Sequence, residues 1–109
     1  MQYIGSYKRN VDSKRRIVFP SVWKSDQKNF FWVERHHEDE DDVLGRIYSE
    51  SEWFEVKEAI DDGKEREEFF SRSYKLKLDK SNRLLLPKNC TLKVIDMVGC
   101  IDYIIIQAL

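Results

Sequence analysis

The stretch YKRNVDSKRRIVFP, at residues 7–20, decides the fold, because its layout returns as YKLKLDKSNRLLLP at residues 74–87, 67 positions further on. The pairs that coincide without gaps are Tyr7 with Tyr74, Lys8 with Lys75, Asp12 with Asp79, Arg16 with Arg83, and Pro20 with Pro87. Self-similarity at a fixed spacing indicates a structural unit that occurs twice. The sequence therefore predicts a duplicated fold built around two copies of one motif.

Each copy is predicted to contain two strands joined by a polar turn and followed by a short helix. Polar and apolar residues alternate before the Asp, and a short apolar run follows the Arg, which is typical of a β-hairpin. Asp at the turn entrance can accept turn N–H groups, and Asn82 tolerates the left-handed backbone of such turns better than Arg15 at the matching place. Pro20 and Pro87 end their strands and can each open a helix.

Other elements are predicted between and after the two copies. Strands are expected at residues 29–34, 44–48, 93–98 and 102–107. Ser49 and Glu52 have the spacing of a capping box, so a helix should begin there and end at Gly63. A second, more acidic helix, GKEREEFFSRS, should follow and bury both of its phenylalanines. The aromatic residues are predicted to pack in the core or in a subunit interface, and we therefore expect self-association.

The paired D-x-x-x-R turns, the opening YIGSYKRNVDSKRR, the central SESEWFEVKEAI and the second LDKSNRLLLP resemble the MraZ family, within the swapped-hairpin AbrB superfamily. The resemblance covers nearly the whole chain. It implies a β-rich α+β fold, a duplicated swapped-hairpin AbrB-like (double-split) small barrel with short helices. One domain would hold two AbrB-like repeats, at about residues 1–62 and 63–109, the second without its C-terminal helix. Family members usually have Gly just before the motif Arg, where this chain has Arg15 and Asn82.

The net charge of −1 hides a segregation that follows the repeat. Residues 1–24 hold six basic and one acidic side chain, a net charge of +5. Residues 25–74 hold seven basic and sixteen acidic side chains, a net charge of −9, and residues 75–109 hold six and three, a net charge of +3. A polyanion responds to the field at the face that it contacts, so both copies of the motif are candidate contacts and the middle of the chain is not.

Charge and resemblance together predict a sequence-specific regulator of transcription that binds double-stranded DNA. The candidate DNA contacts are Lys8, Lys14, Arg15, Arg16, Lys75, Lys77, Lys80, Asn82 and Arg83. The lysines would mainly neutralise phosphates, whereas Arg16 and Arg83 would read bases, with Arg15 and Asn82 beside them. In the other interpretation, the two arginines form local ion pairs with Asp12 and Asp79, which stabilise the turns. The two interpretations do not exclude each other.

The MraZ resemblance further implies a ring-like homo-oligomer on direct repeats upstream of the cell-division and cell-wall gene cluster, in the cytoplasm and associated with the nucleoid. No apolar run approaches the ~18 residues that span a bilayer, and the start MQYIGSYKRN lacks the apolar region of a signal peptide. The alternative is an AbrB-like interaction module of the antitoxin type, whose acidic middle binds a basic protein. An enzyme is ranked third, behind these two hypotheses, because no nucleophile is evident beside a base. We therefore expect no catalytic residue, cofactor, small-molecule substrate or membrane partner.

His36 and His37 are followed by five consecutive carboxylates, which raises the question of a metal site. Adjacent histidines on a strand point to opposite faces, and no spaced third ligand is evident, so the sequence predicts a solvated acidic loop and no metal. Cys90 and Cys100 lack metal-ligand spacing, and both are predicted to be reduced residues of the core or surface.

Overall fold

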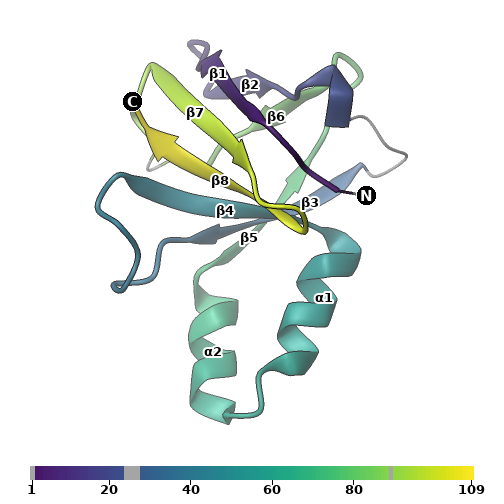
Figure 1. The fold of residues 1–109 in the computed structure, drawn as a ribbon, viewed down its shortest axis with the longest axis vertical. Coiled ribbons are helices and arrows are strands. Elements are labelled where there is room, and N and C mark those ends of the chain that lie inside the picture. The colour runs from purple at the N-terminus through teal and green to yellow at the C-terminus, as the bar shows by residue number, and fades with distance from the viewer. Residues whose placement is uncertain (1, 24–27, 89) are drawn as a thin grey trace.

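The computed structural model describes residues 2–23, 28–88 and 90–109. These residues form β-strands, two α-helices and one short 3-10 helix (Figure 1). In chain order the elements are β1 (Ser6–Asn10), β2 (Arg16–Val18), η1 (Ser21–Trp23), β3 (Asn29–Glu34), β4 (Val43–Ser49), α1 (Glu50–Ala59), α2 (Gly63–Ser71), β5 (Ser73–Lys77), β6 (Arg83–Leu85), β7 (Val94–Gly99) and β8 (Tyr103–Ala108). The four strands predicted outside the repeated motif are confirmed as β3, β4, β7 and β8, with each end within one residue of its expected place.

The strands form two antiparallel sheets. The larger one has six strands in the order β1-β7-β8-β4-β3-β5, and β2 pairs with β6 in a separate two-stranded ribbon. Figure 1 shows the ribbon above the large sheet, with the helices on the side of the sheet away from the ribbon. The β-rich α+β class is therefore confirmed. The strands of the described residues do not close into the predicted small barrel, because β1 and β5 remain as two separate edges.

The hairpin predicted within each copy of the motif is wrong. In the described residues β1 pairs with β7 and β5 pairs with β3, whereas β2 and β6 pair with each other across the two copies. The exception is a single bridge between Leu78 and Leu84 beside the second turn. Ile17 and Leu84 lie opposite each other at the centre of the ribbon and are fully buried, so pairing across the copies brings both side chains into one core.

The strand order reads the same when the two halves of the chain are exchanged. β1 and β5 are the edges of the large sheet, β7 and β3 lie next to them, and β8 and β4 form its centre. The central pair of strands is symmetric about the residue pair Arg46 and Ile105, and the ribbon is symmetric about Ile17 and Leu84. The two halves therefore match in strand order and, apart from a bulge between Val43 and Gly45, in register, which places the two D-x-x-x-R turns at equivalent positions of the fold.

Hydrophobic residues fill both faces of the large sheet. The main core lies between the sheet and the ribbon; its largest fully buried side chains are Trp23, Trp32, Tyr3, Phe30, Ile17, Ile47, Leu84, Leu86, Ile95, Met97, Ile104 and Ile106. A smaller cluster of Val33, Trp53 and Phe69 holds the helices on the opposite face. Ile105 is only half-buried, so the consecutive isoleucines of β8 alternate between the two faces, as strand residues do.

The ends of the two helices were predicted only in part. The predicted N-cap of α1 is confirmed, since the Ser49 hydroxyl accepts from the Glu52 N–H at 3.4 Å. The predicted end at Gly63 is wrong, because α1 ends at Ala59 and Gly63 begins α2 behind the N-cap Asp62. Phe69 is buried as predicted, whereas Phe70 is 44% exposed, because successive helical residues cannot both face the sheet.

Candidate nucleic-acid interface

The two D-x-x-x-R turns lie at one end of the molecule and the helices at the other. We call residues 12–16 the first turn and residues 79–83 the second turn. Each ends on the first residue of a ribbon strand, at the top of Figure 1, and α1 and α2 extend to the bottom along the longest axis. Residues 50–71, which span the helices, hold nine acidic and three basic side chains. The molecule therefore has a basic end at the ribbon and an acidic end at the helices.

The first turn is closed by the carboxylate of Asp12. Its Oδ1 accepts from the backbone N–H groups of Lys14 at 2.9 Å and Arg16 at 2.8 Å, and its Oδ2 accepts from Arg16 Nε at 2.8 Å. The Asp12 N–H also donates to the Arg16 carbonyl at 3.0 Å. The hydrogen bonds to the carboxylate, first among them the one from the Arg16 backbone N–H, hold the pKa of Asp12 below its usual value of 3.8.

The second turn is closed by the same set of bonds. Oδ1 of Asp79 accepts from the N–H groups of Ser81 at 2.8 Å and Arg83 at 2.9 Å, and Oδ2 accepts from Arg83 Nε at 3.0 Å. The pKa of Asp79 is lowered as well, first of all by the backbone hydrogen bond from Arg83. Asp and Arg thus brace both turns in the same way, which was one of the two roles considered for the arginines.

The residue before each motif arginine has a left-handed backbone, with φ of 64° at Arg15 and 58° at Asn82. This conformation costs energy for a residue with a Cβ atom, less for Asn than for Arg. It turns the carbonyl of each residue toward the other half of the chain. The Arg15 carbonyl accepts from the Leu86 N–H, and the Asn82 carbonyl accepts from the Phe19 N–H, both at 2.8 Å. Each turn is therefore fastened to a strand end of the opposite copy.

The outer face of the ribbon carries the two motif arginines beside two exposed apolar side chains. Arg16 lies opposite Leu85, and Arg83 lies opposite Val18, so all four side chains share this face. Val18 is 51% exposed and Leu85 is 47% exposed. Within the described parts of the chain, neither guanidinium has a hydrogen-bond partner at its Nη atoms. The brace through Nε therefore leaves the Nη edge of each arginine open to a ligand.

The predicted lysines are all exposed, and the structure brings some of them together. Lys8 lies on β1, whereas Lys75 and Lys77 lie on β5, at the opposite edge of the large sheet. Arg15 of the first turn shares a hollow of about 520 Å³ with Lys75 and Tyr74, which come from the second copy. Side chains of both copies therefore line one hollow, whereas Lys8 lies on the other edge strand of the sheet, apart from Lys75 and Lys77.

Lys28 and Lys93 were not predicted as DNA contacts from the sequence, but both lie beside the turns. The Lys28 carbonyl accepts from the N–H of Leu78, and the Lys93 carbonyl accepts from the N–H of Val11, both at 2.8 Å. Lys28 lines a hollow of about 540 Å³ with Lys77 and Lys80, and Lys93 lines one beside the first turn. Both lysines directly precede an observed strand, β3 or β7, but their place beside the turns depends on strand pairing across the halves, which the sequence does not encode locally.

The acidic loop between β3 and β4 is held on the sheet by Asp39. Its carboxylate accepts from both Nη atoms of Arg46, at 2.7 and 3.0 Å, and from the His36 N–H at 2.8 Å. The pKa of Asp39 is lowered, mainly by the Arg46 hydrogen bonds. The predicted solvated loop is therefore correct for the exposed Glu40 and Asp41, but wrong for Asp39.

His36 and His37 also depart from the expected geometry. β3 ends at Glu34, so the histidines lie in a turn and not on a strand, and their ring centroids are 4.0 Å apart. Among the described residues, His36, His37 and Glu38 form a group that could hold a metal ion, because their ligand atoms lie within 4.8 Å of one another. The argument that adjacent histidines must point apart is therefore wrong here.

No model of a known protein family matches this chain, and a search of curated proteins finds no match either. Within the described residues, no helix is both long enough and apolar enough to span a membrane. The function is therefore argued from the geometry of the two turns and their charges.

Proposed function

We propose that this chain is a sequence-specific, DNA-binding regulator of transcription of the MraZ type, which contacts double-stranded DNA with both turns. The observation that carries the proposal is the repetition of one braced basic turn at one end of the molecule, with an open arginine edge in each. Two equivalent contacts on a rigid support suit a ligand that itself repeats, and a two-stranded ribbon fits the major groove of DNA.

The fold that accompanies this proposal is the duplicated swapped hairpin of the AbrB superfamily, with repeats at about residues 1–62 and 63–109. The pairing of β2 with β6 supports it, because each short strand leaves its own copy and completes the other. The reciprocal bonds from the Leu86 N–H to Arg15 and from the Phe19 N–H to Asn82 support it further. The positive φ values at Arg15 and Asn82 also give a physical reason for the glycine that the family usually has there.

In the proposed complex the lysines and the motif arginines contact different parts of the DNA. The exposed Lys8, Lys14, Lys75, Lys77 and Lys80, joined by Lys28 and Lys93, neutralise phosphates and fix the register on the duplex. Arg16 and Arg83, which are anchored through Nε, present their Nη atoms to guanine O6 and N7. The bracing carboxylates reduce the entropy that each arginine loses on binding, so bracing and base reading support each other.

The decisive experiment selects a preferred duplex from a random pool and then compares the wild type with an Arg16→Lys, Arg83→Lys double variant. Lysine keeps the charge but loses the planar fork. Preference for the selected duplex over random DNA should fall by about 1–3 kcal/mol for each lost contact, while binding to random DNA stays nearly constant. Arg66→Lys on α2, at the acidic end, is the matched control and should keep the preference. A double variant with undiminished preference contradicts base reading by these arginines.

A second experiment tests the assignment of the basic face. Lys75→Ala with Lys77→Ala should weaken binding to every duplex and reduce the salt dependence by about one counterion for each lost phosphate contact. Lys57→Ala with Lys64→Ala removes the same charge from the helices, so it should leave affinity almost unchanged. Equal losses from both pairs would mean that net charge, and not the basic end, sets the affinity.

The same proposal includes a ring-like homo-oligomer that acts in the cytoplasm, at the nucleoid, on the promoter of the cell-division and cell-wall gene cluster. Exposed apolar side chains support self-association, and they include Ile4, Val22, Phe54, Phe70, Ile101 and Leu109. Light scattering at micromolar concentration should give a mass several times 13.1 kDa. A monodisperse species of 13.1 kDa would contradict the oligomer but not DNA binding.

The second candidate is an interaction module of the antitoxin type that binds a basic protein. The exposed rings of Phe54 and Phe70 at the acidic end favour it, because aromatic side chains among carboxylates suit a cationic partner. In this case neither the arginine variant nor the lysine variant should alter binding of the basic protein, whereas Phe54→Ser with Phe70→Ser should abolish that binding. Failure of both DNA experiments together with this result would favour the interaction module.

A further inference from the structure

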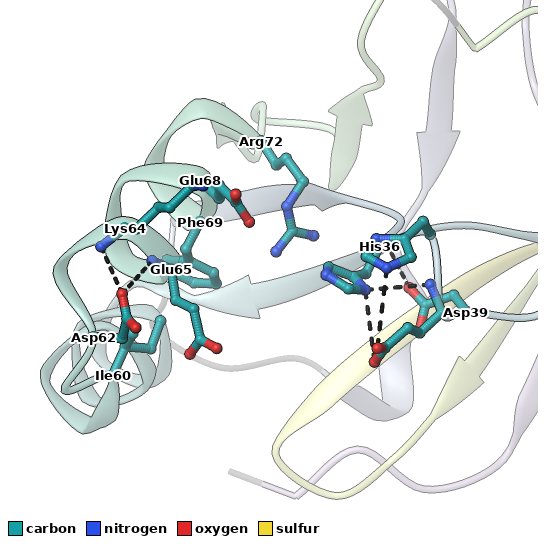
Figure 2. Close-up of a pocket in the computed structure, with 11 residues that line it drawn as sticks. His36, Asp39, Ile60, Asp62, Lys64, Glu65, Glu68, Phe69 and Arg72 are labelled. Atoms are coloured by element: carbon teal, nitrogen blue, oxygen red, sulfur yellow. Dashed lines mark hydrogen bonds and ion pairs between the residues drawn. The ribbon is translucent and has the colours of Figure 1, made fainter.

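We propose that His36, His37 and Glu38 form a binding site for a borderline divalent metal ion of the Zn²⁺ class, at the cleft between α2 and the loop that joins β3 to β4. This site lies apart from the basic turns, and it does not depend on the DNA-binding proposal. Figure 2 shows the cleft, with His36 and Asp39 on one wall and Glu65, Glu68 and Phe69 of α2 on the other. Its volume is about 670 Å³.

The loop holds the backbone that carries the three side chains in place before any ion arrives. Asp39 accepts from the His36 N–H at 2.8 Å and is itself bound twice by Arg46, while Arg35 Nη2 donates to the Asp39 carbonyl at 3.0 Å. Because Arg46 lies on β4, one of the two central strands of the large sheet, these bonds fasten the turn to the middle of the sheet. The histidines are thus part of a supported turn, which lowers the entropy cost of coordination.

The ligand atoms already have nearly the spacing that a metal requires. His36 Nδ1 lies 3.9 Å from one carboxylate oxygen of Glu38, and His37 Nε2 lies 4.0 Å from the other. Two ligands on a tetrahedral zinc ion at bonds of about 2.0–2.1 Å are about 3.4 Å apart. His36 Nδ1 accepts from the Glu38 N–H at 3.2 Å, so it presents a lone pair, and coordination would replace this long hydrogen bond.

The charge of the cleft favours a cation. Its lining contains the five carboxylates of Glu38, Asp39, Asp62, Glu65 and Glu68 against the two cations of Lys64 and Arg72. Asp39 is bound to Arg46, and Asp62 caps α2, so these two are not free to move. Glu65 and Glu68 lie three residues apart on one face of α2 and can add a ligand or bind the outer water molecules of the ion.

The ligand set selects the class of metal. Imidazole nitrogen with one carboxylate suits Zn²⁺, Cu²⁺ or Ni²⁺, whereas Mg²⁺ and Ca²⁺ prefer oxygen alone. Two histidines and one carboxylate leave one position of a tetrahedral ion for water or for a further ligand from α2. If α2 supplies that further ligand, the metal connects the acidic loop to the helix.

The experiment uses the fact that His36 and His37 are the only histidines of the chain. Proton NMR of the wild-type protein, titrated with Zn²⁺, should shift or broaden both imidazole signals at one equivalent, and Mg²⁺ in tenfold excess should not. This measurement needs no variant and therefore does not depend on a mutant that folds. Unmoved imidazole signals in the presence of bound zinc would assign the metal to carboxylates or to the cysteines and overturn the proposal.

Variants then test the ligand set by calorimetry. His36→Ala and His37→Ala should each weaken Zn²⁺ binding at least tenfold, and Glu38→Gln should weaken it as well. Glu40→Gln removes an exposed carboxylate of the same loop that lies outside the three, and it should bind Zn²⁺ like the wild type. A double His36→Ala, His37→Ala variant that binds zinc as tightly as the wild type would refute the site.

Discussion

The two copies of the motif close their turns with the same hydrogen bonds but have different side chains packed around their strands. In the first copy Tyr7 packs edge-on against Trp23, with ring centroids 5.0 Å apart, and Trp23 is buried and donates from Nε1 to the Ile4 carbonyl. In the second copy the place of Trp23 is taken by Cys90: the Trp23 N–H donates to the Pro20 carbonyl and the Cys90 N–H to the Pro87 carbonyl, both at 3.0 Å. Tyr74, which matches Tyr7, is 46% exposed.

This difference shows that the shape of a turn and the stability of its surroundings depend on different residues. The Asp carboxylate sets the shape through bonds within five residues, and these bonds survive in both copies. The support comes from more distant residues and differs between the copies, since the first copy has a large aromatic cluster around Trp23, whereas the second has the small thiol of Cys90, which lines a hollow with residues of the first turn. The two contacts proposed for DNA can therefore be alike in geometry and unequal in stability.

The largest expected difference between the copies concerns Trp23 and Cys90. Trp23→Ala removes a side chain that is 2% exposed and contacts the rings of Tyr3, Tyr7 and Phe19, so unfolding free energy should fall by about 3–5 kcal/mol. Cys90→Ala removes one sulfur atom and should cost about 1 kcal/mol. Urea unfolding followed by tryptophan fluorescence or circular dichroism measures both. Equal losses would show that the two supports are equivalent after all.

The next prediction tests whether the two braces are equal. Asp12→Asn and Asp79→Asn should lower the melting temperature at neutral pH by similar amounts, because each aspartate makes the same bonds. The pKa of both carboxyls is lowered in the folded state, so their contribution to stability is present above the usual value of 3.8 and is lost as the pH falls through the lowered pKa.

Melting curves of the wild type and both variants, recorded from neutral pH to below 3.8, check this prediction. The wild type should lose its advantage over each variant in the acid range, and it should do so over the same interval for both. An advantage that persists in acid, or that exists for one turn alone, would contradict the idea of two equivalent braces.

The comparison also explains what the sequence could predict. Alternation and capping are local, so β3, β4, β7, β8 and the start of α1 followed from their own residues. The ribbon did not, because strands of three residues carry too little pattern to choose a partner, and the choice depends on burying Ile17 with Leu84. An alternating run before a turn therefore suggested a local hairpin, although the partners lie in the other copy.

The candidate site, too, was predictable only where its contacts are local in the sequence. The Asp and Arg of each turn were recognisable, because their bonds span four residues. Lys28 and Lys93 were not, since strand pairing between the halves brings them to the turns. The paired histidines were misjudged for a related reason: the Asp39–Arg46 ion pair, seven residues apart, supports a turn, whereas the sequence argument gave the two histidines the alternating geometry of a strand.

The smallest predicted effect concerns the left-handed residues. Arg15 and Asn82 share a positive φ, but Asn tolerates it better, and Arg15 also has a buried Nε without a partner among the described residues. Arg15→Gly should therefore stabilise the protein by about 1 kcal/mol, whereas Asn82→Gly should change the stability by a few tenths of a kcal/mol at most.

The alanine variants separate backbone strain from side-chain effects, because Ala removes the side chain but keeps the penalty for positive φ. At position 15 we expect Gly above Arg and Ala, and at position 82 we expect Gly and Asn together above Ala. Thermal unfolding of the four variants measures this order. If Arg15→Ala were as stable as Arg15→Gly, the buried guanidinium and not the backbone would be the source of the strain, and the two turns would differ in side-chain burial alone.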